Sequence, residues 1–307
     1  MDGNVLTLVA AEPGPLVESW ADAAARALEK LGALLGGTAW LAPKLACDIV
    51  FDGLDPDQAE AAARGYLAMA PVDLIAQNLA GRKKRLLLAD MESTIIANEM
   101  LDEIADLVGI KTKVAAITRR AMNDEIDFVG ALKERVALLK DKPASLLEEA
   151  AKRMRITPGA RELVSTMRAN GATTALVSGG FSIYTARIRE ELGFDLDFAN
   201  ELEISRDKIA GTVREPIKTG DSKLETLTRL AAEHGCPLAL TLAVGDGSND
   251  LPMLGAAGLG IAFHGRPHVA PRVRHRVDHA DLTALLYAQG YRRDEFVVED
   301  GRRRRTR

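Results

Sequence analysis

The sequence predicts an α/β protein with a parallel-sheet core, a helical cap inserted into that core, and a small α+β domain before it. Three observations lead to this fold class. Short strands and helices alternate over residues 1–80, continuous apolar strands alternate with helices from residue 86 onward, and helical segments alone fill about 98–155. A chain of 307 residues is long enough for about two such domains.

The first 80 residues predict a small domain of the ferredoxin-like type. Apolar and β-branched runs predict strands at 4–10, 38–42, 46–52 and 71–77, and amphipathic patterns predict helices at 14–35 and 55–69. The resulting order βαββαβ is that of a ferredoxin-like fold. The polar stretch GRKKR at 81–85 marks a linker to the next domain.

Residues 81–295 predict the core domain, and residues 296–307 an arginine-rich tail. Continuous apolar runs, typical of a parallel sheet covered on both faces, predict strands at 85–90, 173–180, 241–247 and 259–263. The first strand is followed by four helical segments, at 99–109, 113–125, 127–140 and 144–154. This cap is expected to cover the carboxyl ends of the strands, where open α/β sheets bind ligands.

Charge and composition favour a cytoplasmic protein that acts on a small molecule. The net charge of −4 argues against a nucleic-acid binder. The two cysteines form no disulfide framework, and no apolar run is long enough to span a bilayer. The first residues also lack the basic segment of a secretory signal. Whether the small domain supports a homodimer or binds an effector stays open.

Three predicted strands end in polar groups that would converge at one edge of the sheet. They contribute Asp90, Glu92 and Thr94, then Ser178, Gly179 and Gly180, then Asp246, Asn249 and Asp250. Clustered carboxylates need a cation among them, and an all-oxygen set suits Mg²⁺. The hydroxyl and glycine backbone groups of the second segment could hold phosphate, opposite Lys223. The set indicates phosphoryl transfer through an aspartyl-phosphate.

Four motifs of this set resemble those of the haloacid dehalogenase superfamily. They are DMEST, LVSGGFS, the lysine of SKLETL, and VGDGSNDLPM. More narrowly, the helical stretches NEMLDEIADLVG, ITRRAMNDEIDF and LKERVALLK are similar to those of phosphoserine phosphatases of serine biosynthesis. The resemblance covers about residues 86–290 and implies a Rossmann-like core and a Mg²⁺-dependent hydrolysis of O-phospho-L-serine. The first 80 residues resemble, less specifically, the ACT-like region of bacterial members.

The resemblance implies a role for each matching residue of the core. Asp90 would be the nucleophile, and Glu92 stands where the family has its general acid/base Asp. The side chains of Asp90 and Asp246 and the backbone carbonyl of Glu92 would bind Mg²⁺. The phosphate and the metal surroundings would be supported by Ser178, Gly179, Lys223, Asn249 and Asp250.

In the cap, the resemblance assigns Glu99 to the ammonium group of the substrate and Arg135 to its carboxylate. Met122 and Phe128 would close over the substrate. The first two assignments are chemically reasonable on their own, because a zwitterionic end needs one acid and one planar pair of donors, which Arg supplies and Lys does not. Closure of the cap would exclude water.

Simpler interpretations stay open for several of these residues. Asp90 and Glu92 could cap a helix, Lys223 could lie on a helix surface, and the cap residues could be ordinary surface charges or core. The four histidines of segment 264–279 could suggest a metal site. At the level of the whole protein, transfer to another small alcohol such as homoserine and a non-catalytic amino-acid sensor are the alternatives.

Overall fold

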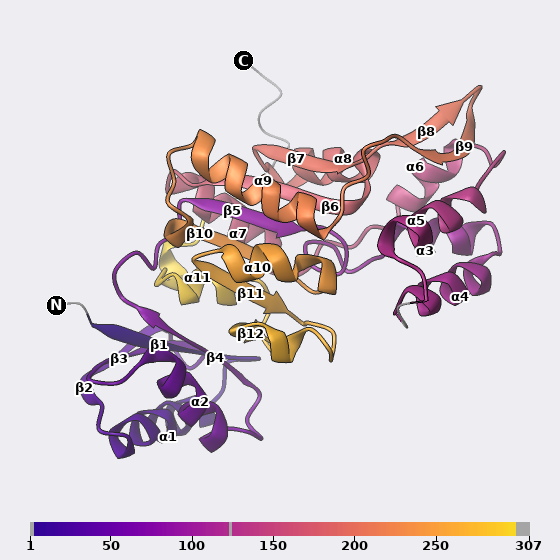
Figure 1. Cartoon of the computed structure of the whole chain (residues 1–307). Helices are drawn as coiled ribbons and strands as arrows, with labels where there is room; N and C mark the ends of the chain where they lie inside the picture. The colour runs from indigo at the N-terminus through magenta and orange to yellow at the C-terminus, as the bar shows by residue number, and fades with distance from the viewer. Residues whose placement is uncertain (1–2, 123–124, 299–307) are drawn as a thin grey trace.

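The computed structural model describes residues 3–122 and 125–298, without the side chain of Met122 (Figure 1). The described chain contains a four-stranded antiparallel sheet near the N-terminus, a six-stranded parallel sheet, and a two-stranded hairpin. This arrangement confirms the predicted fold class. No helix within the described ranges is both long and apolar enough to cross a bilayer.

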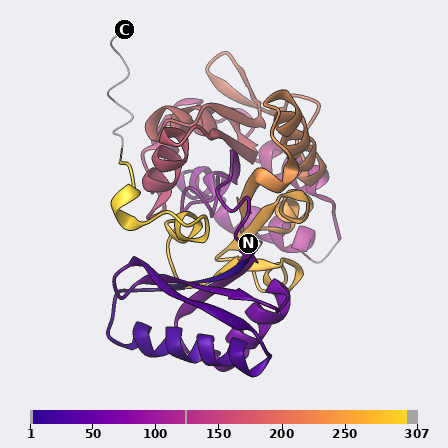
Figure 2. The same cartoon turned by 90° about the vertical axis from the view of Figure 1, so that its left-hand side faces the viewer.

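The N-terminal unit has the predicted βαββαβ order. Its strands are β1 (Asn4–Ala10), β2 (Leu34–Ala42), β3 (Ala46–Asp52) and β4 (Val72–Asn78), and its helices are α1 (Leu16–Lys30) and α2 (Pro56–Tyr66). The sheet order is β2-β3-β1-β4, and every pair is antiparallel. Both helices cover the same face of this sheet (Figures 1 and 2). The other face is therefore free to pack on the rest of the chain.

The core is a parallel sheet whose order, β12-β11-β10-β5-β6-β7, places the first strand, β5, in the middle. Its strands are β5 (Leu86–Asp90), β6 (Thr173–Phe181), β7 (Leu196–Asn200), β10 (Thr241–Gly245), β11 (Leu259–Phe263) and β12 (His275–Val277). The sequence pattern did not predict β7 and β12. Both lie at the edges of the sheet. β7 is mostly half-buried, and β12 has only three residues, two of them His275 and Arg276, so neither shows a continuous apolar run.

Helices cover both faces of this sheet. They are α7 (Ala160–Ala169), α8 (Ser182–Leu192), α9 (Gly220–Glu233), α10 (Leu251–Ala256) and α11 (Ala284–Ala288). Successive side chains of a strand point to opposite faces. Leu86 and Leu88 accordingly pack in the cluster that holds α9 and α10, whereas Leu87 packs in the cluster on the other face. This double coverage explains why β5 reads as an unbroken apolar run.

The helical cap follows β5 and lies beyond one end of the parallel sheet (Figure 1). It consists of α3 (Met100–Leu107), α4 (Lys111–Met122), α5 (Phe128–Ala137) and α6 (Ser145–Ala151). A hairpin that the sequence did not predict, β8 (Leu202–Ser205) and β9 (Lys208–Val213), joins it from the core. The amide of Asp141 donates to the carbonyl of Ile209, and the amide of Ile209 donates to the carbonyl of Lys142, both at 2.9 Å. The cap is thus held by two separate parts of the chain.

Buried polar contacts dock the N-terminal unit on the edge of the core sheet beside β12. The carboxylate of Asp73 accepts hydrogen bonds from the backbone amides of residues 278, 279 and 280. His275 Nδ1 lies 2.9 Å from Glu60 Oε2, and both side chains are buried. The histidine segment therefore contributes to the contact between the two units, and His264 and His268 have their own separate partners.

Candidate active site

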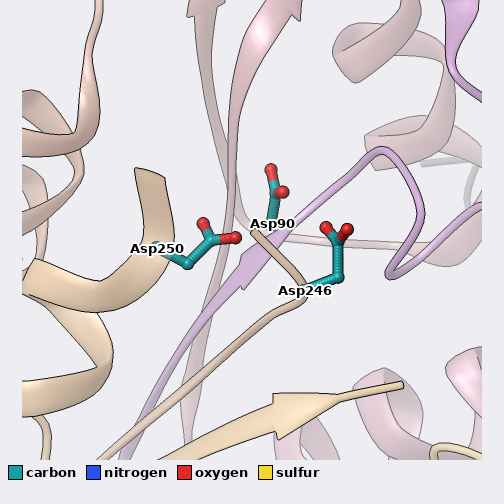
Figure 3. Close-up of side chains that lie close together, drawn as sticks. All are labelled: Asp90, Asp246 and Asp250. Carbon is teal, nitrogen blue, oxygen red and sulfur yellow. The ribbon is translucent and has the colours of Figure 1, made fainter. Parts of the chain in front are cut away.

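Three carboxylates from the ends of two adjacent strands, β5 and β10, meet at the end of the parallel sheet. Asp90 ends β5, Asp246 follows β10, and Asp250 lies in the short 3₁₀ turn Ser248–Asp250. One oxygen of each lies within 4.8 Å of the others, and all three residues are buried (Figure 3). Among the described residues, this is the one group of His, Cys, Asp and Glu side chains with such spacing. Adjacent parallel strands bring them together, as the sequence predicts.

Lys223 neutralises part of this cluster. It lies in the first turns of α9, and its side chain is only 2% exposed. Its Nζ is 2.8 Å from Asp90 Oδ1 and 2.6 Å from Asp250 Oδ1. Burial alone would lower the pKa of Lys223, but the two carboxylates raise it above its ordinary value. The lysine is therefore a buried permanent cation and not a surface residue.

One positive charge does not balance three buried carboxylates. Burial and the neighbouring Asp250 raise the pKa of Asp90 well above its ordinary value, in spite of Lys223. The same two causes raise the pKa of Asp246 to about 6. Oδ1 of Asp90 also accepts the amide of Met91 at 2.8 Å, so Oδ2 is the less committed oxygen. The site has the oxygen donors and the excess negative charge that suit a divalent cation.

The segment at the end of β6 combines a hydroxyl with close-packed glycines. Ser178 is buried, and its Oγ accepts the amide of Gly180 at 2.9 Å. A Cβ placed on Gly179 would lie 2.9 Å from Cζ of Phe128, and one on Gly180 would lie 2.6 Å from Glu92 Oε2. Any side chain at these two positions would collide with the cap residue and with the second acid. The cap therefore packs directly on this segment.

Glu92 connects the core to the cap. Its Oε1 accepts the backbone amide of Met100, the first residue of α3, at 2.7 Å. Glu92 thus accepts a hydrogen bond from the first turn of a cap helix, and this contact is compatible with either interpretation of the residue. Burial and the carboxylate of Glu99 raise the pKa of Glu92 to about 8. Burial thus favours the protonated form of this carboxyl group, which is the form that can donate a proton.

The two polar cap residues face the same region. Glu99 Oε1 accepts the hydroxyl of Ser93 at 2.9 Å and remains partly exposed. Within the described part of the chain, Arg135 on α5 donates one hydrogen bond, from Nε to the carbonyl of Ala131. Burial lowers its pKa, and the charges of Glu92 and Glu99 act against that effect, so both acids lie near its guanidinium. One acid and one arginine thus stand together above the carboxylate cluster.

The remaining predicted residues have different outcomes. Asn249 lies in the turn with Asp250, where a Cβ on Gly247 would be 2.4 Å from its Oδ1. Thr94 is fully buried, and its hydroxyl has no partner within the described residues. Met122 ends α4, and its side chain lies outside the described part of the chain. The interpretation of this methionine stays a prediction.

Sequence reasoning missed Arg266, which follows β11. Its Nη2 lies 3.1 Å from Glu99 Oε1, and its Nε lies 3.2 Å from Asp246 Oδ2. The arginine therefore joins a cap acid to an acid of the cluster. It stands outside every motif, and the segment around it attracts attention by its histidines, so no local pattern points to it.

Comparison with known proteins identifies the family. The profile of the haloacid dehalogenase-like hydrolases matches residues 87–255, which is more than half of the chain. The chain belongs to this family. This haloacid dehalogenase-like hydrolase is 37% identical over 260 residues to a phosphoserine phosphatase of Streptomyces coelicolor, with 84% of its own length and 63% of the relative's covered. The resemblance inferred from the motifs is confirmed.

Solved structures agree with this placement of the hydrolase. A haloacid dehalogenase family hydrolase from Salmonella enterica serovar Typhi has a TM-score of 0.83 and 27% identity, covering 94% of this chain and 98% of the other. A phospho-aspartyl intermediate analogue of phosphoserine phosphatase has a TM-score of 0.63 and 40% identity, covering 67% and 98%. The chain spans between about half and two thirds of the first curated relatives that it matches.

Proposed function

We propose that this hydrolase is a Mg²⁺-dependent phosphoserine phosphatase, which converts O-phospho-L-serine and water into L-serine and phosphate. The observation that carries the proposal is the buried set of Asp90, Lys223, Asp246 and Asp250 directly below a cap that presents Glu99 and Arg135. The first group fits a phosphoryl transfer, and the second fits an amino-acid end. The names of its relatives support the same substrate.

The carboxylate cluster fits the metal of this proposal. Asp90 and Asp246 would hold Mg²⁺ with their side chains and Glu92 with its backbone carbonyl, while both oxygens of Asp250 are already engaged by Lys223 and the amide of Gly247. Asp250 would therefore support the ligands. When bound, Mg²⁺ would withdraw charge from the phosphate oxygens.

The reaction itself divides between Asp90 and Glu92. An oxygen of Asp90 attacks phosphorus and forms a new P–O bond as the bond to the serine oxygen breaks. Glu92, whose carboxyl group occupies the space where a side chain at Gly180 would lie, gives its proton to the departing oxygen. It then takes a proton from water, whose oxygen attacks the aspartyl-phosphate and releases Asp90. Lys223 favours the ionised form of Asp90 that attacks, against the burial and the Asp250 charge that raise the pKa of Asp90, and bound Mg²⁺ would favour it further.

Substrate choice rests on the cap. Glu99 would take the ammonium group and Arg135 the carboxylate, with Phe128 packed on Gly179 to exclude water. The proposal also includes a cytoplasmic location, a place in serine biosynthesis, and phosphoserine as a small-molecule partner. Both cysteines, Cys47 and Cys236, are free and buried, which fits a reducing compartment.

The decisive experiment measures phosphate release from phosphoserine with and without Mg²⁺ for three proteins. Asp90→Asn should abolish turnover while the protein stays folded, because an amide cannot form the acyl-phosphate. The matched control is Asp22→Asn, on the exposed side of α1, which should act as wild type. Rapid acid quench of wild type with ³²P-labelled substrate should trap label on the peptide that contains Asp90. Label on another peptide, or none, would refute the nucleophile.

The same experiment addresses the two alternatives. Added amino alcohols such as homoserine should leave the yield of inorganic phosphate unchanged; a phosphorylated amino alcohol would reveal transfer in place of hydrolysis. A wild-type protein that releases no phosphate with Mg²⁺ would favour the non-catalytic sensor.

A further inference from the structure

Arg266 forms ion pairs with two acids, and in the proposed reaction each of these acids binds a different cation. Its Nε contacts Asp246, which would bind Mg²⁺, and its Nη2 contacts Glu99, which would bind the substrate ammonium. Both roles of Arg266 rest on the proposed function.

The backbone of Arg266 is fixed, so its position beside the site is built into the fold. Its amide donates to the carbonyl of Asp246 at 3.1 Å, and its own carbonyl accepts the amides of Val269 and Ala270. The loop after β11 is thereby tied to the turn after β10. Only the side chain can change position, either contacting the two acids or extending into solvent.

The exposure of the two site cations separates their roles. The Lys223 side chain is 2% exposed between two buried carboxylates, and breaking a pair of that kind leaves an uncompensated buried charge. The Arg266 side chain is 39% exposed and that of Glu99 is 40% exposed. The Arg266–Glu99 pair is open to water and contributes little to stability. The side chain of Asp246 is only 8% exposed, so it needs a cation, whether Arg266 or another. Lys223 is therefore permanent, and Arg266 can be exchanged where another cation takes its place at Asp246.

We propose that Arg266 is a positioning residue that competes with Mg²⁺ for Asp246 and with the ammonium group of the substrate for Glu99, and that it is displaced when these cations bind. In the absence of ligands it prevents repulsion between Asp246 and Glu99 and links the cap to the core. Binding of either cation removes one of its two partners, so metal and substrate compete with the same side chain. Once released, its guanidinium is available to the anionic groups of the substrate.

Calorimetric titration of Mg²⁺ into the full-length protein without substrate tests this proposal. Arg266→Gln should bind Mg²⁺ more tightly than wild type, by about three- to tenfold at low salt, because the competing cation is gone. Arg272→Gln is the matched control, since it removes the same charge from an exposed position of the neighbouring turn. It should bind within about twofold of wild type, because a charge exposed to water interacts only weakly with the buried cluster. Arg266→Lys keeps the charge without the paired donors and should give an intermediate affinity.

Thermal melting separates displacement from a merely structural role. In EDTA, Arg266→Gln should melt below wild type, and saturating Mg²⁺ should remove most of the difference. A deficit that persists in Mg²⁺, an affinity equal to or weaker than that of wild type, or a wild type that binds no Mg²⁺ would each overturn the proposal. A protein that hydrolyses phosphoserine but shows unchanged Mg²⁺ affinity in Arg266→Gln would refute this inference and leave the proposed function intact.

Discussion

Replacing Glu92 by Gln and by Asp should separate the two roles of this residue. The 2.7 Å bond from the amide of Met100 to Oε1 fixes the cap helix, and the carboxyl group beside Gly180 serves proton transfer. Gln keeps the length and an acceptor oxygen but cannot give and take the proton. Asp keeps the acid but withdraws it by one C–C bond, about 1.5 Å, which stretches the contact with Met100 beyond hydrogen-bonding range.

The expected magnitudes follow from these contacts. Glu92→Gln should slow phosphoserine turnover by about 10²-fold or more, the usual size of general acid/base effects, with little change in thermal stability in Mg²⁺. Glu92→Asp should retain activity, because its intrinsic pKa is similar, and should lose about 0.5–1.5 kcal/mol of stability with the hydrogen bond. Steady-state and single-turnover assays, with thermal melting of the same samples, measure both effects. Full activity of Glu92→Gln in both assays would show that another group or water moves the proton.

Three further predictions concern specificity, pH and the contact between the two units. Arg135→Ala should reduce kcat/KM for phosphoserine at least about 30-fold more than for O-phosphoethanolamine, which lacks only the carboxylate. The reason is that losing one partner of a buried charged pair costs about 2–5 kcal/mol. Equal losses for the two substrates would mean that Arg135 has a structural role. The pKa of Glu92 is raised from 4.5 to about 8, so between these pH values the folded state holds a proton that the unfolded chain releases. The melting temperature in EDTA should therefore fall as pH rises from 5 to 8, and it should fall less steeply in Glu92→Gln. Parallel curves for the two proteins would argue against the raised pKa. Asp73→Ala removes the carboxylate that accepts from the backbone amides of residues 278–280. Each buried amide left without a partner costs about 1–3 kcal/mol of stability, so the melting temperature should fall by several degrees. An unchanged melting temperature would mean that water replaces the carboxylate.

Much of the fold could be predicted because its determinants are local. The apolar run before Asp90 reads as a strand covered on both faces, and β5 indeed lies at the centre of the sheet. The order of strands and helices over residues 1–80 was equally readable from their periodicity. The predicted convergence of Asp90, Asp246 and Asp250 needs only one further rule, that parallel strands end at the same edge.

The tertiary structure alone decided the contacts that join distant parts of the chain. Glu99 and Arg266 are 167 residues apart in sequence, and Asp73 and Ala280 are 207 apart, so no window of local pattern contains both partners. The hairpin β8–β9 has short strands, and its place beside the cap depends on backbone hydrogen bonds to residues 141–144. At position 92, the sequence showed Glu where the family has Asp. Only the structure showed that the longer side chain reaches the backbone amide of Met100 in the cap. Local periodicity specifies which residues are buried in a strand or helix, whereas long-range packing specifies which charge meets which.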